Sequence, residues 1–138
     1  LARLEGTYVD PYLHRTSADL PAQVGVLFAV DADSEAAQTA AHDVAVHIAA
    51  MSPTYLNRDE VPEDIVTDER RIAEETARAE GKPERAMQNI IEGRLTGYFK
   101  DVVLLDQPFA KDTKNTVGGV LEEAGTKAVS FARFRVGA

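Results

Sequence analysis

The residues of this sequence that could do chemistry are, first, its three histidines, His14, His42 and His47. His42 and His47 are five positions apart, which places them about 140° apart around a helix. Two histidines on one helix need a spacing of three or four to share a metal ion, so this pair does not form a chelate. We expect His42 to face solvent. His47 lies nearer the apolar face of its helix, and it fits either a partly buried polar residue or an interface contact.

Carboxylates are the second candidate group, and they are densest between residues 58 and 71. There they alternate with arginines: Asp59, Glu60, Glu63, Asp64, Asp68 and Glu69 lie among Arg58, Arg70 and Arg71. A catalytic carboxylate needs a pocket that shifts its pKa, whereas this mixture is typical of a solvated, ion-paired helix face. Cysteine, a P-loop and the G-x-S-x-G pattern are all absent from the sequence. The sequence therefore predicts no catalytic residue, no metal site and no cofactor.

A third candidate is the segment 107–112, Gln-Pro-Phe-Ala-Lys-Asp. It has the composition of an exposed loop that carries one aromatic residue, Phe109. Exposed aromatic side chains often anchor protein interfaces, but the composition favours the alternative, in which Phe109 turns inward and stiffens the loop. His14, which follows Tyr12 at the end of an expected edge strand, fits a surface position at the strand end.

The overall composition narrows the class of partner. The 138 residues include 23 acidic and 15 basic side chains, for a net charge of −8. A nucleic-acid-binding surface needs clustered lysine and arginine, so we expect no direct nucleic-acid contact. No apolar run approaches the roughly 20 residues that cross a bilayer, and the first residues do not resemble a signal peptide. We expect a cytoplasmic protein without membrane contact, and, because the first residue is Leu1, further residues upstream.

The elements that must position these residues begin with strands and a helix. Residues 7–14 have β propensity but contain Pro11, which favours an edge strand broken at the proline. Residues 24–30 are almost all apolar, which predicts a strand buried on both faces. Asp31 and Ser34 offer capping oxygens for a helix that runs to about Ala50 and ends before Pro53.

A helical hairpin should follow over residues 62–80 and 83–99. Pro62 and Pro83 suit the first turns of two helices, and Gly81 can take the left-handed conformation between them. So short a connection makes the helices antiparallel. We expect one apolar stripe, Met87, Ile91, Leu95 and Tyr98, to face a sparser one, Ile65, Ile72, Thr76 and Ala79.

The rest of the chain reads as a buried run over 102–105, a short helix capped by Asn115 or Thr116, and a final strand over 127–136. Strands near both ends with helices between them predict an α+β fold: a small antiparallel sheet packed with helices, and a protruding antiparallel helical hairpin. We expect residues 1–61 and 101–138 to form the core subdomain, and residues 62–100 to be a coiled-coil-like insertion.

Several blocks keep a specific order and spacing along the chain: Gly25-Val26-Leu27, the run from His42 to Ala50, Gly81-Lys82-Pro83-Glu84, Ile90-Ile91-Glu92-Gly93-Arg94-Leu95, Leu104-Leu105-Asp106-Gln107-Pro108-Phe109, Lys111-Asp112, Thr116-Val117-Gly118 and Arg133-Phe134-Arg135-Val136-Gly137. Together they resemble the bacterial translation elongation factor Ts family. The resemblance runs from about Leu4 to Gly137 and is weakest over residues 14–23, where this sequence has a longer loop.

The resemblance implies a guanine nucleotide exchange factor that acts by binding a protein and is not an enzyme. Its partner would be elongation factor Tu, both GDP-bound and nucleotide-free, and the chain would correspond to the second core subdomain with its hairpin. The positions that match docking residues of the family are His14, His47, Phe109, Ala110 and Lys111. The family's Thr-Asp-Phe-Val element has no counterpart here, so the alternative is a binding or dimerisation module without exchange activity of its own. A homodimer or a 2:2 complex also stays open.

Overall fold

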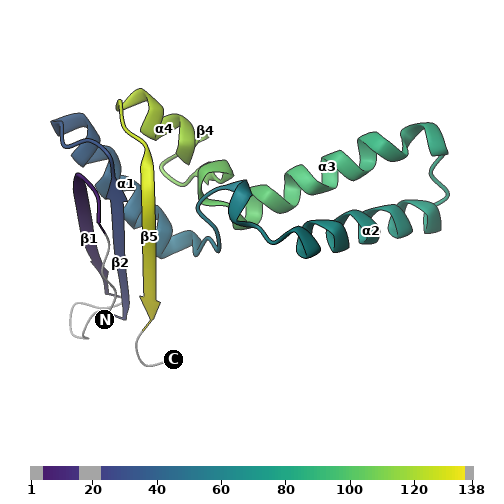
Figure 1. The fold of residues 1–138 in the computed structure, drawn as a ribbon, viewed down its shortest axis with the longest axis horizontal. Helices are drawn as coiled ribbons and strands as arrows, with labels where there is room; N and C mark the ends of the chain where they lie inside the picture. The colour runs from purple at the N-terminus through teal and green to yellow at the C-terminus, as the bar shows by residue number, and fades with distance from the viewer. Residues whose placement is uncertain (1–4, 16–22, 136–138) are drawn as a thin grey trace.

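The computed structural model describes residues 5–15 and 23–135. Most of the loop expected over residues 14–23 lies outside the described residues, as does Val136 at the end of the expected last strand. Within them the fold is α+β, as predicted: an antiparallel sheet with helices on one face, and a helical hairpin that projects from it (Figure 1).

The main sheet has three antiparallel strands in the order β1-β2-β5. They are β1 (Tyr8–His14), β2 (Val24–Val30) and β5 (Ala128–Arg135). The predicted edge position of β1 is confirmed, but the expected break at Pro11 is wrong, because Pro11 lies inside the strand opposite Leu27. Proline lacks an N–H group, and an edge strand tolerates this because one side of its backbone has no partner strand.

Helix α1 (Glu35–Met51) covers one face of this sheet. It begins as predicted, because the Ser34 hydroxyl accepts a hydrogen bond of 3.1 Å from the Ala37 N–H. Alanines on its inner face let it approach the strands closely, and Phe28, Val44 and Ile48 are fully buried between them. The helix ends at Ser52, which has a left-handed φ of 52° immediately before Pro53.

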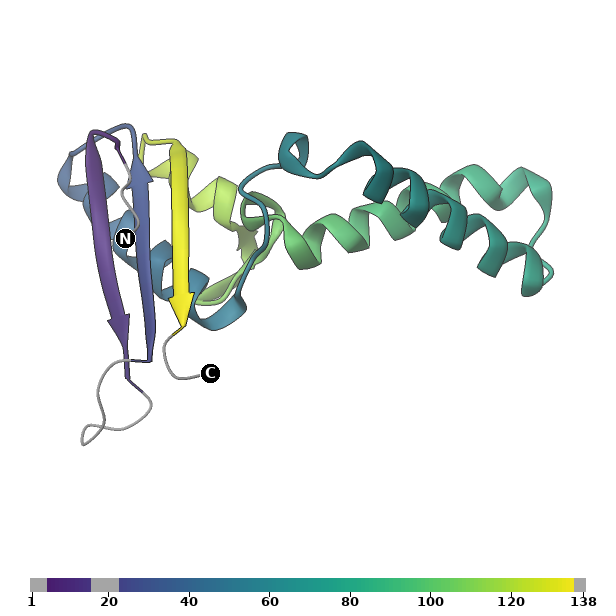
Figure 2. The ribbon, with the colours of Figure 1, turned by 60° about the horizontal axis from the view of Figure 1, so that its bottom comes forward.

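The opposite face of the sheet is not covered by any described helix, as Figures 1 and 2 show. Leu13 and Phe134 are 67% and 40% exposed there, and they border a shallow apolar hollow with Pro11, Gly25 and Leu27. The expectation that residues 24–30 are buried on both faces is therefore wrong for Gly25 and Leu27, which are only half-buried. The apolar composition of residues 24–30 does not reveal that helices pack on only one face of the sheet.

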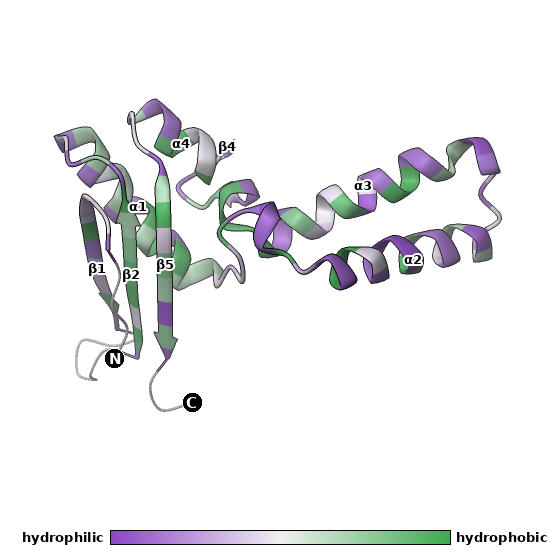
Figure 3. Cartoon of the chain, viewed as in Figure 1, coloured by the Kyte–Doolittle hydropathy of each residue, from purple (hydrophilic) through white to green (hydrophobic). Residues whose placement is uncertain are grey.

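The hairpin consists of α2 (Glu63–Ala79) and α3 (Glu84–Val102), joined through Gly81 with φ 76°. Figure 3 shows how hydrophilic α2 is along most of its length. The predicted stripe of α3 is confirmed for its first three members, which form a small separate core with two alanines of α2: Met87, Ile91, Leu95, Ala73 and Ala77.

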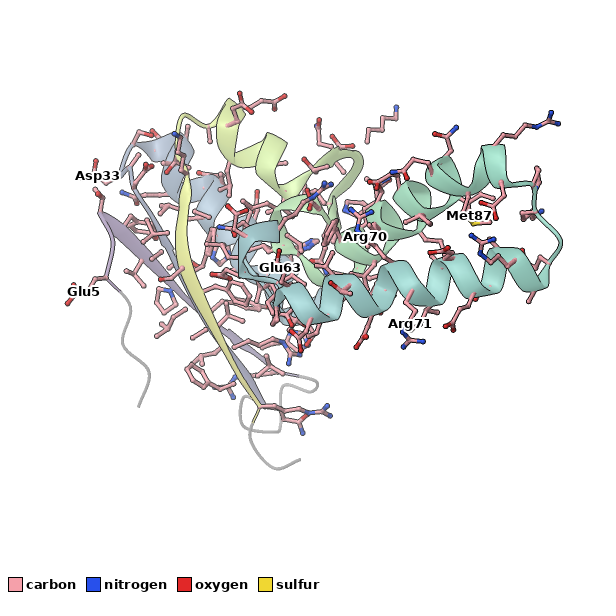
Figure 4. All side chains as sticks on the ribbon, turned by 45° about the vertical axis from the view of Figure 1, so that its right-hand side comes forward. Glu5, Asp33, Glu63, Arg70, Arg71 and Met87 are labelled. Carbon is pink, nitrogen blue, oxygen red and sulfur yellow. The ribbon has the colours of Figure 1, made fainter. Side chains whose placement is uncertain are left out.

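The predicted stripe of α2 is wrong for Ile72 and Ala79, which are exposed, whereas Ile65 and Thr76 are half-buried. Ile72 is 42% exposed, and Ala73 and Ala77 are the buried residues of this helix. The small alanine side chains let α3 pack closely, while Arg70 reaches across to Glu92 at 2.8 Å. Figure 4 shows Met87 on the α2 side of α3, and Arg71 directed away from it.

The base of the hairpin is tied to the core by backbone hydrogen bonds. The N–H groups of Thr54 and Tyr55 donate to the Val102 carbonyl, and the Leu104 N–H donates to the Tyr55 carbonyl at 2.8 Å. The short helices η1 (Arg58–Glu60) and η2 (Leu104–Asp106) flank this junction. The two ends of the hairpin therefore leave the core side by side.

The segment expected as an exposed loop is a small hairpin of strands β3 (Pro108–Phe109) and β4 (Asp112–Thr116). Helix α4 (Val117–Glu123) follows, and of the two expected caps Thr116 is the one used, since its hydroxyl accepts from the Gly119 N–H at 3.1 Å. This places Ala110 and Lys111 at the turn between β3 and β4. Among the described helices we find no stretch both long and apolar enough to cross a bilayer.

Candidate docking site

His47 lies at the centre of the candidate site, on the side of α1 that faces the β3–β4 hairpin. Its side chain is buried, with only 1% of the residue surface exposed. The backbone N–H of Ala110 donates to Nδ1 at 3.1 Å, and Nε2 lies 2.8 Å from Oε1 of Gln107. The Phe109 ring stacks on the imidazole with ring centres 6.0 Å apart. One ring thus connects α1 to both ends of the 107–110 segment.

These contacts define the protonation state of His47. A backbone N–H can only donate, so Nδ1 must be the unprotonated acceptor and the ring proton must lie on Nε2, facing the Gln107 oxygen. Burial lowers the pKa of His47 below its ordinary value of 6.5, although the hydrogen bond with Gln107 acts in the opposite direction. The buried ring is therefore neutral at pH 7.

Gln107 is a buried polar residue of this site whose contacts the sequence reasoning missed. Its side-chain amide donates to the Asp101 carbonyl at 2.9 Å, which directs its oxygen to His47, and its own carbonyl accepts from the Val117 N–H. Gln107 therefore links the end of α3, the start of α4 and α1. The available signal was a glutamine close to the apolar residues Leu105 and Phe109, because an amide that becomes buried among them must find partners.

Phe109 is buried, with 5% of its surface exposed, so the inward-facing alternative is confirmed and the exposed aromatic anchor is wrong for this residue. The physical reason is the short β3–β4 hairpin, which folds back on α1 and puts the ring against His47. Ala110 and Lys111, in contrast, are exposed at the turn. The Lys111 ammonium lies 3.5 Å from a carboxylate oxygen of Asp43.

A hollow of about 400 Å³ opens beside this turn. It runs between α1 and the turn, and Val46 and Ala50 contribute apolar surface to it. Four of the five residues predicted for docking surround or adjoin it: His47, Phe109, Ala110 and Lys111.

His14, the fifth, lies apart from the others at the exposed end of β1. The Tyr12 hydroxyl is 3.1 Å from its Nδ1, and the Tyr12 ring meets the His42 ring edge-on at 5.9 Å. His42 borders the hollow and is half-exposed, but it is not simply solvated, because its Nδ1 donates to the buried Asp10 at 3.2 Å. A row of side chains therefore connects His14 to the hollow.

The pairing of His42 with Asp10 was also missed. The sequence pattern that indicates it is the spacing of Tyr8, Asp10 and Tyr12 at every second position, which puts all three on one side of β1. The Tyr8 hydroxyl donates to Asp10 at 3.0 Å, and this carboxylate raises the pKa of Tyr8. Within residues 5–15 and 23–135, no three histidine, aspartate or glutamate side chains gather closely enough to hold a metal ion.

Comparison with known proteins shows the family that this chain matches. The family model described as Elongation factor TS matches residues 1–138. Elongation factor Ts of Renibacterium salmoninarum is 71% identical over 138 residues, which are 100% of this chain and 50% of that protein. Elongation factor Ts of Micrococcus luteus is 70% identical over 137 residues, 99% of this chain and 49% of that protein. The chain spans about half the length of the curated relatives it matches.

Proposed function

The chain belongs to the elongation factor Ts family, and from this premise we propose that it supplies the docking half of a cytoplasmic factor that binds elongation factor Tu and promotes exchange of GDP for GTP. The family match over residues 1–138 carries this proposal. The exposed turn at Ala110 and Lys111, beside an apolar hollow, supports the place of docking.

Exchange of this kind needs no nucleotide pocket on the chain itself. If the factor binds the nucleotide-free partner more tightly than the GDP-bound partner, then by linkage it weakens GDP binding by the same factor. The task of this chain is then to supply binding energy. An apolar side chain of the partner that enters the hollow would reach Val46 and the edges of the His47 and Phe109 rings, and an acceptor group would meet Lys111.

Lys111 is the residue whose removal tests the docking site most directly. Its side chain is 72% exposed, so Lys111→Ala should leave the fold intact. We expect affinity for elongation factor Tu to fall by about 1–2 kcal/mol, roughly 5- to 30-fold, as for a hot-spot residue. Calorimetric titration of the 138-residue chain into elongation factor Tu measures this. Lys100→Ala, which removes one exposed positive charge from α3, is the matched control, and equal losses for both variants would contradict the assignment.

The second candidate is a binding or dimerisation module without exchange activity of its own. The uncovered apolar face of the sheet around Leu13 and Phe134 favours it, because such a face suits assembly. Stopped-flow release of fluorescent GDP from elongation factor Tu separates the two: full acceleration by this chain alone would contradict the second candidate. Sedimentation of the chain with and without elongation factor Tu distinguishes a 1:1 complex from a homodimer or a 2:2 complex.

A further inference from the structure

We propose that His47 and Gln107 form a positioning pair that holds the β3–β4 turn against α1 only while the His47 ring is neutral, so that uptake of one proton by this ring releases the turn. The consequence for affinity rests on the proposed function, because it assumes that the turn contacts elongation factor Tu. The behaviour of the turn itself does not depend on that assumption.

The turn is joined to α1 by two contacts of His47 and by the exposed ion pair of Lys111 with Asp43. The Ala110 N–H is directed at Nδ1 of His47, and the Phe109 ring stacks on the same imidazole. Pro108 pairs with Thr116, but the register shifts before Phe109 pairs with Asp112, so the two-stranded ladder is short and irregular. A change in the His47 ring therefore acts on a turn that has little regular strand pairing of its own.

Gln107 fixes the direction in which the ring presents its acceptor. Its amide group donates to the Asp101 carbonyl, so its oxygen points to Nε2 and selects the tautomer with the proton there. That tautomer leaves Nδ1 free to accept from Ala110. The orientation of Gln107, and not the histidine alone, makes the Ala110 hydrogen bond available.

A second proton on the ring cannot be accommodated in this arrangement. The imidazolium donates from both nitrogens, so an N–H group would face the Ala110 N–H at a distance that now measures 3.1 Å from N to N. Rotating the ring by 180° does not help, because the other nitrogen is then also protonated. The hydrogen bond to Ala110 must break, and the buried cation gains by moving toward water.

The charged groups around the His47 ring are paired with other residues and do not neutralise a positive charge on the imidazole. Asp43 of α1 is engaged with Lys111 of the turn, and His42 of α1 with Asp10 of β1. Asp106 of η2 pairs with Arg58 at 2.7 Å. No carboxylate among the described residues forms a hydrogen bond or ion pair with the imidazole, which agrees with the lowered pKa of His47.

The unmodified chain provides the first test, by NMR without any partner. At pH 8 we expect the His47 ring nitrogens to show the tautomer with the proton on Nε2. As the pH falls below about 6.5 toward the midpoint of the His47 ring, we expect the Ala110 amide to lose protection from hydrogen exchange by up to about tenfold per pH unit, and to be released once the ring is protonated. A proton on Nδ1 at pH 8, or Ala110 protection that does not change while His47 titrates, would overturn the proposal. So would a His47 ring that stays neutral until the whole chain unfolds.

Two variants of nearly equal size test the acceptor itself. His47→Asn can place its amide oxygen near the position of Nδ1 and cannot be protonated, so Ala110 should stay protected at pH 5. His47→Gln extends its amide toward Gln107 and offers no acceptor beside Ala110, so Ala110 should lose protection even at pH 8. His42→Asn, in the same helix and at the same hollow, is the control and should leave Ala110 protection unchanged. Equal behaviour of His47→Asn and His47→Gln would argue against the positioning role.

Affinity for elongation factor Tu separates this inference from the proposed function. We expect the unmodified chain to bind more weakly at pH 5.5 than at pH 7.5, and His47→Asn to lose less affinity over this interval. If Ala110 is released as expected but the chain does not bind elongation factor Tu at either pH, the proposed function fails and the positioning pair stands. If binding occurs without any dependence on His47 while Ala110 is released, the turn is not part of the docking surface, and the link to affinity fails.

Discussion

The polar side chains beneath the proposed docking surface satisfy one another's hydrogen bonds. Asp10 accepts from Tyr8 and His42, and His47 accepts from Ala110 and contacts Gln107. Buried groups of this kind cost free energy when a partner is lost, since no water replaces it. A change of charge at His47 should therefore be measurable in the stability of the chain.

Stability should fall on mild acidification because the pKa of His47 is lowered in the folded chain. Below the ordinary value of 6.5 the unfolded chain takes up a proton at this residue, while the folded chain does not until the lowered pKa is reached. The free energy of unfolding is therefore undiminished above about pH 6.5 and falls below it, by at most about 1.4 kcal/mol per pH unit. Urea unfolding at pH 7.5 and 5.5 measures the decrease, and His47→Asn should show a smaller one. Identical decreases would exclude His47 as the cause.

Single residues were predictable where the cause is local. The caps at Ser34 and Thr116 and the left-handed Gly81 depend on neighbours within a few positions, and all three are confirmed. The burial of Phe109 and the partner of Gln107 depend on which distant segment packs against them. His47 and Gln107 are 60 positions apart, and no local pattern predicts such a contact.

At the scale of elements, the helical hairpin shows what periodicity leaves undetermined. Helix α2 has two faces that could meet α3, one through Ile72 and one through Ala73 and Ala77. In the structure Ala73 and Ala77 pack against α3, and these small side chains allow the helices to approach closely. The β3–β4 hairpin was missed for a related reason: Asp112–Thr116 has no apolar alternation, so its strand character arises from its partner and not from its own residues.

A pair of isoleucine variants tests the packing of this hairpin. Ile91, 9% exposed, lies in the core between the helices, whereas Ile72 is 42% exposed. We expect Ile91→Ala to destabilise the hairpin by about 2–4 kcal/mol and Ile72→Ala to change its stability by less than about 0.5 kcal/mol. Hydrogen exchange of the amides in α2 and α3 measures both. A larger loss for Ile72→Ala would restore the stripe predicted from the sequence.

On the scale of the whole molecule, buried apolar side chains within residues 5–15 and 23–135 form two core clusters. One joins the three-stranded sheet, α1 and α4, and the other lies within the hairpin. We therefore propose that the chain divides into a core of residues 1–61 and 101–138 and an insertion of residues 62–100. The general α+β architecture was predictable from the order of strands and helices, but the uncovered sheet face was not, because it depends on the number of layers.

Removal of the hairpin tests the proposed division. We expect a variant with a short glycine–serine linker in place of residues 62–100 to keep the protection of the α1 and β2 amides against hydrogen exchange, since their apolar contacts lie outside the hairpin. The slope of its unfolding free energy against urea concentration should decrease, because less surface is exposed on unfolding. Loss of α1 and β2 protection would show that the two parts fold as one unit. Ile91→Ala, which weakens the hairpin without removing it, is the control.

The backbone hydrogen bonds at the base of the hairpin also affect the entropy of closing the inserted segment into a loop. Because Tyr55 is held beside Val102 and Leu104, the segment between them is a closed loop whose ends are already fixed. The entropy of closing such a loop grows only with the logarithm of its length, so doubling the insertion costs the core about 0.6 kcal/mol. Each residue added to both helices extends the arm by about 1.5 Å. The reach of the arm can therefore change by whole helical turns with little effect on the free energy of the fold that carries it.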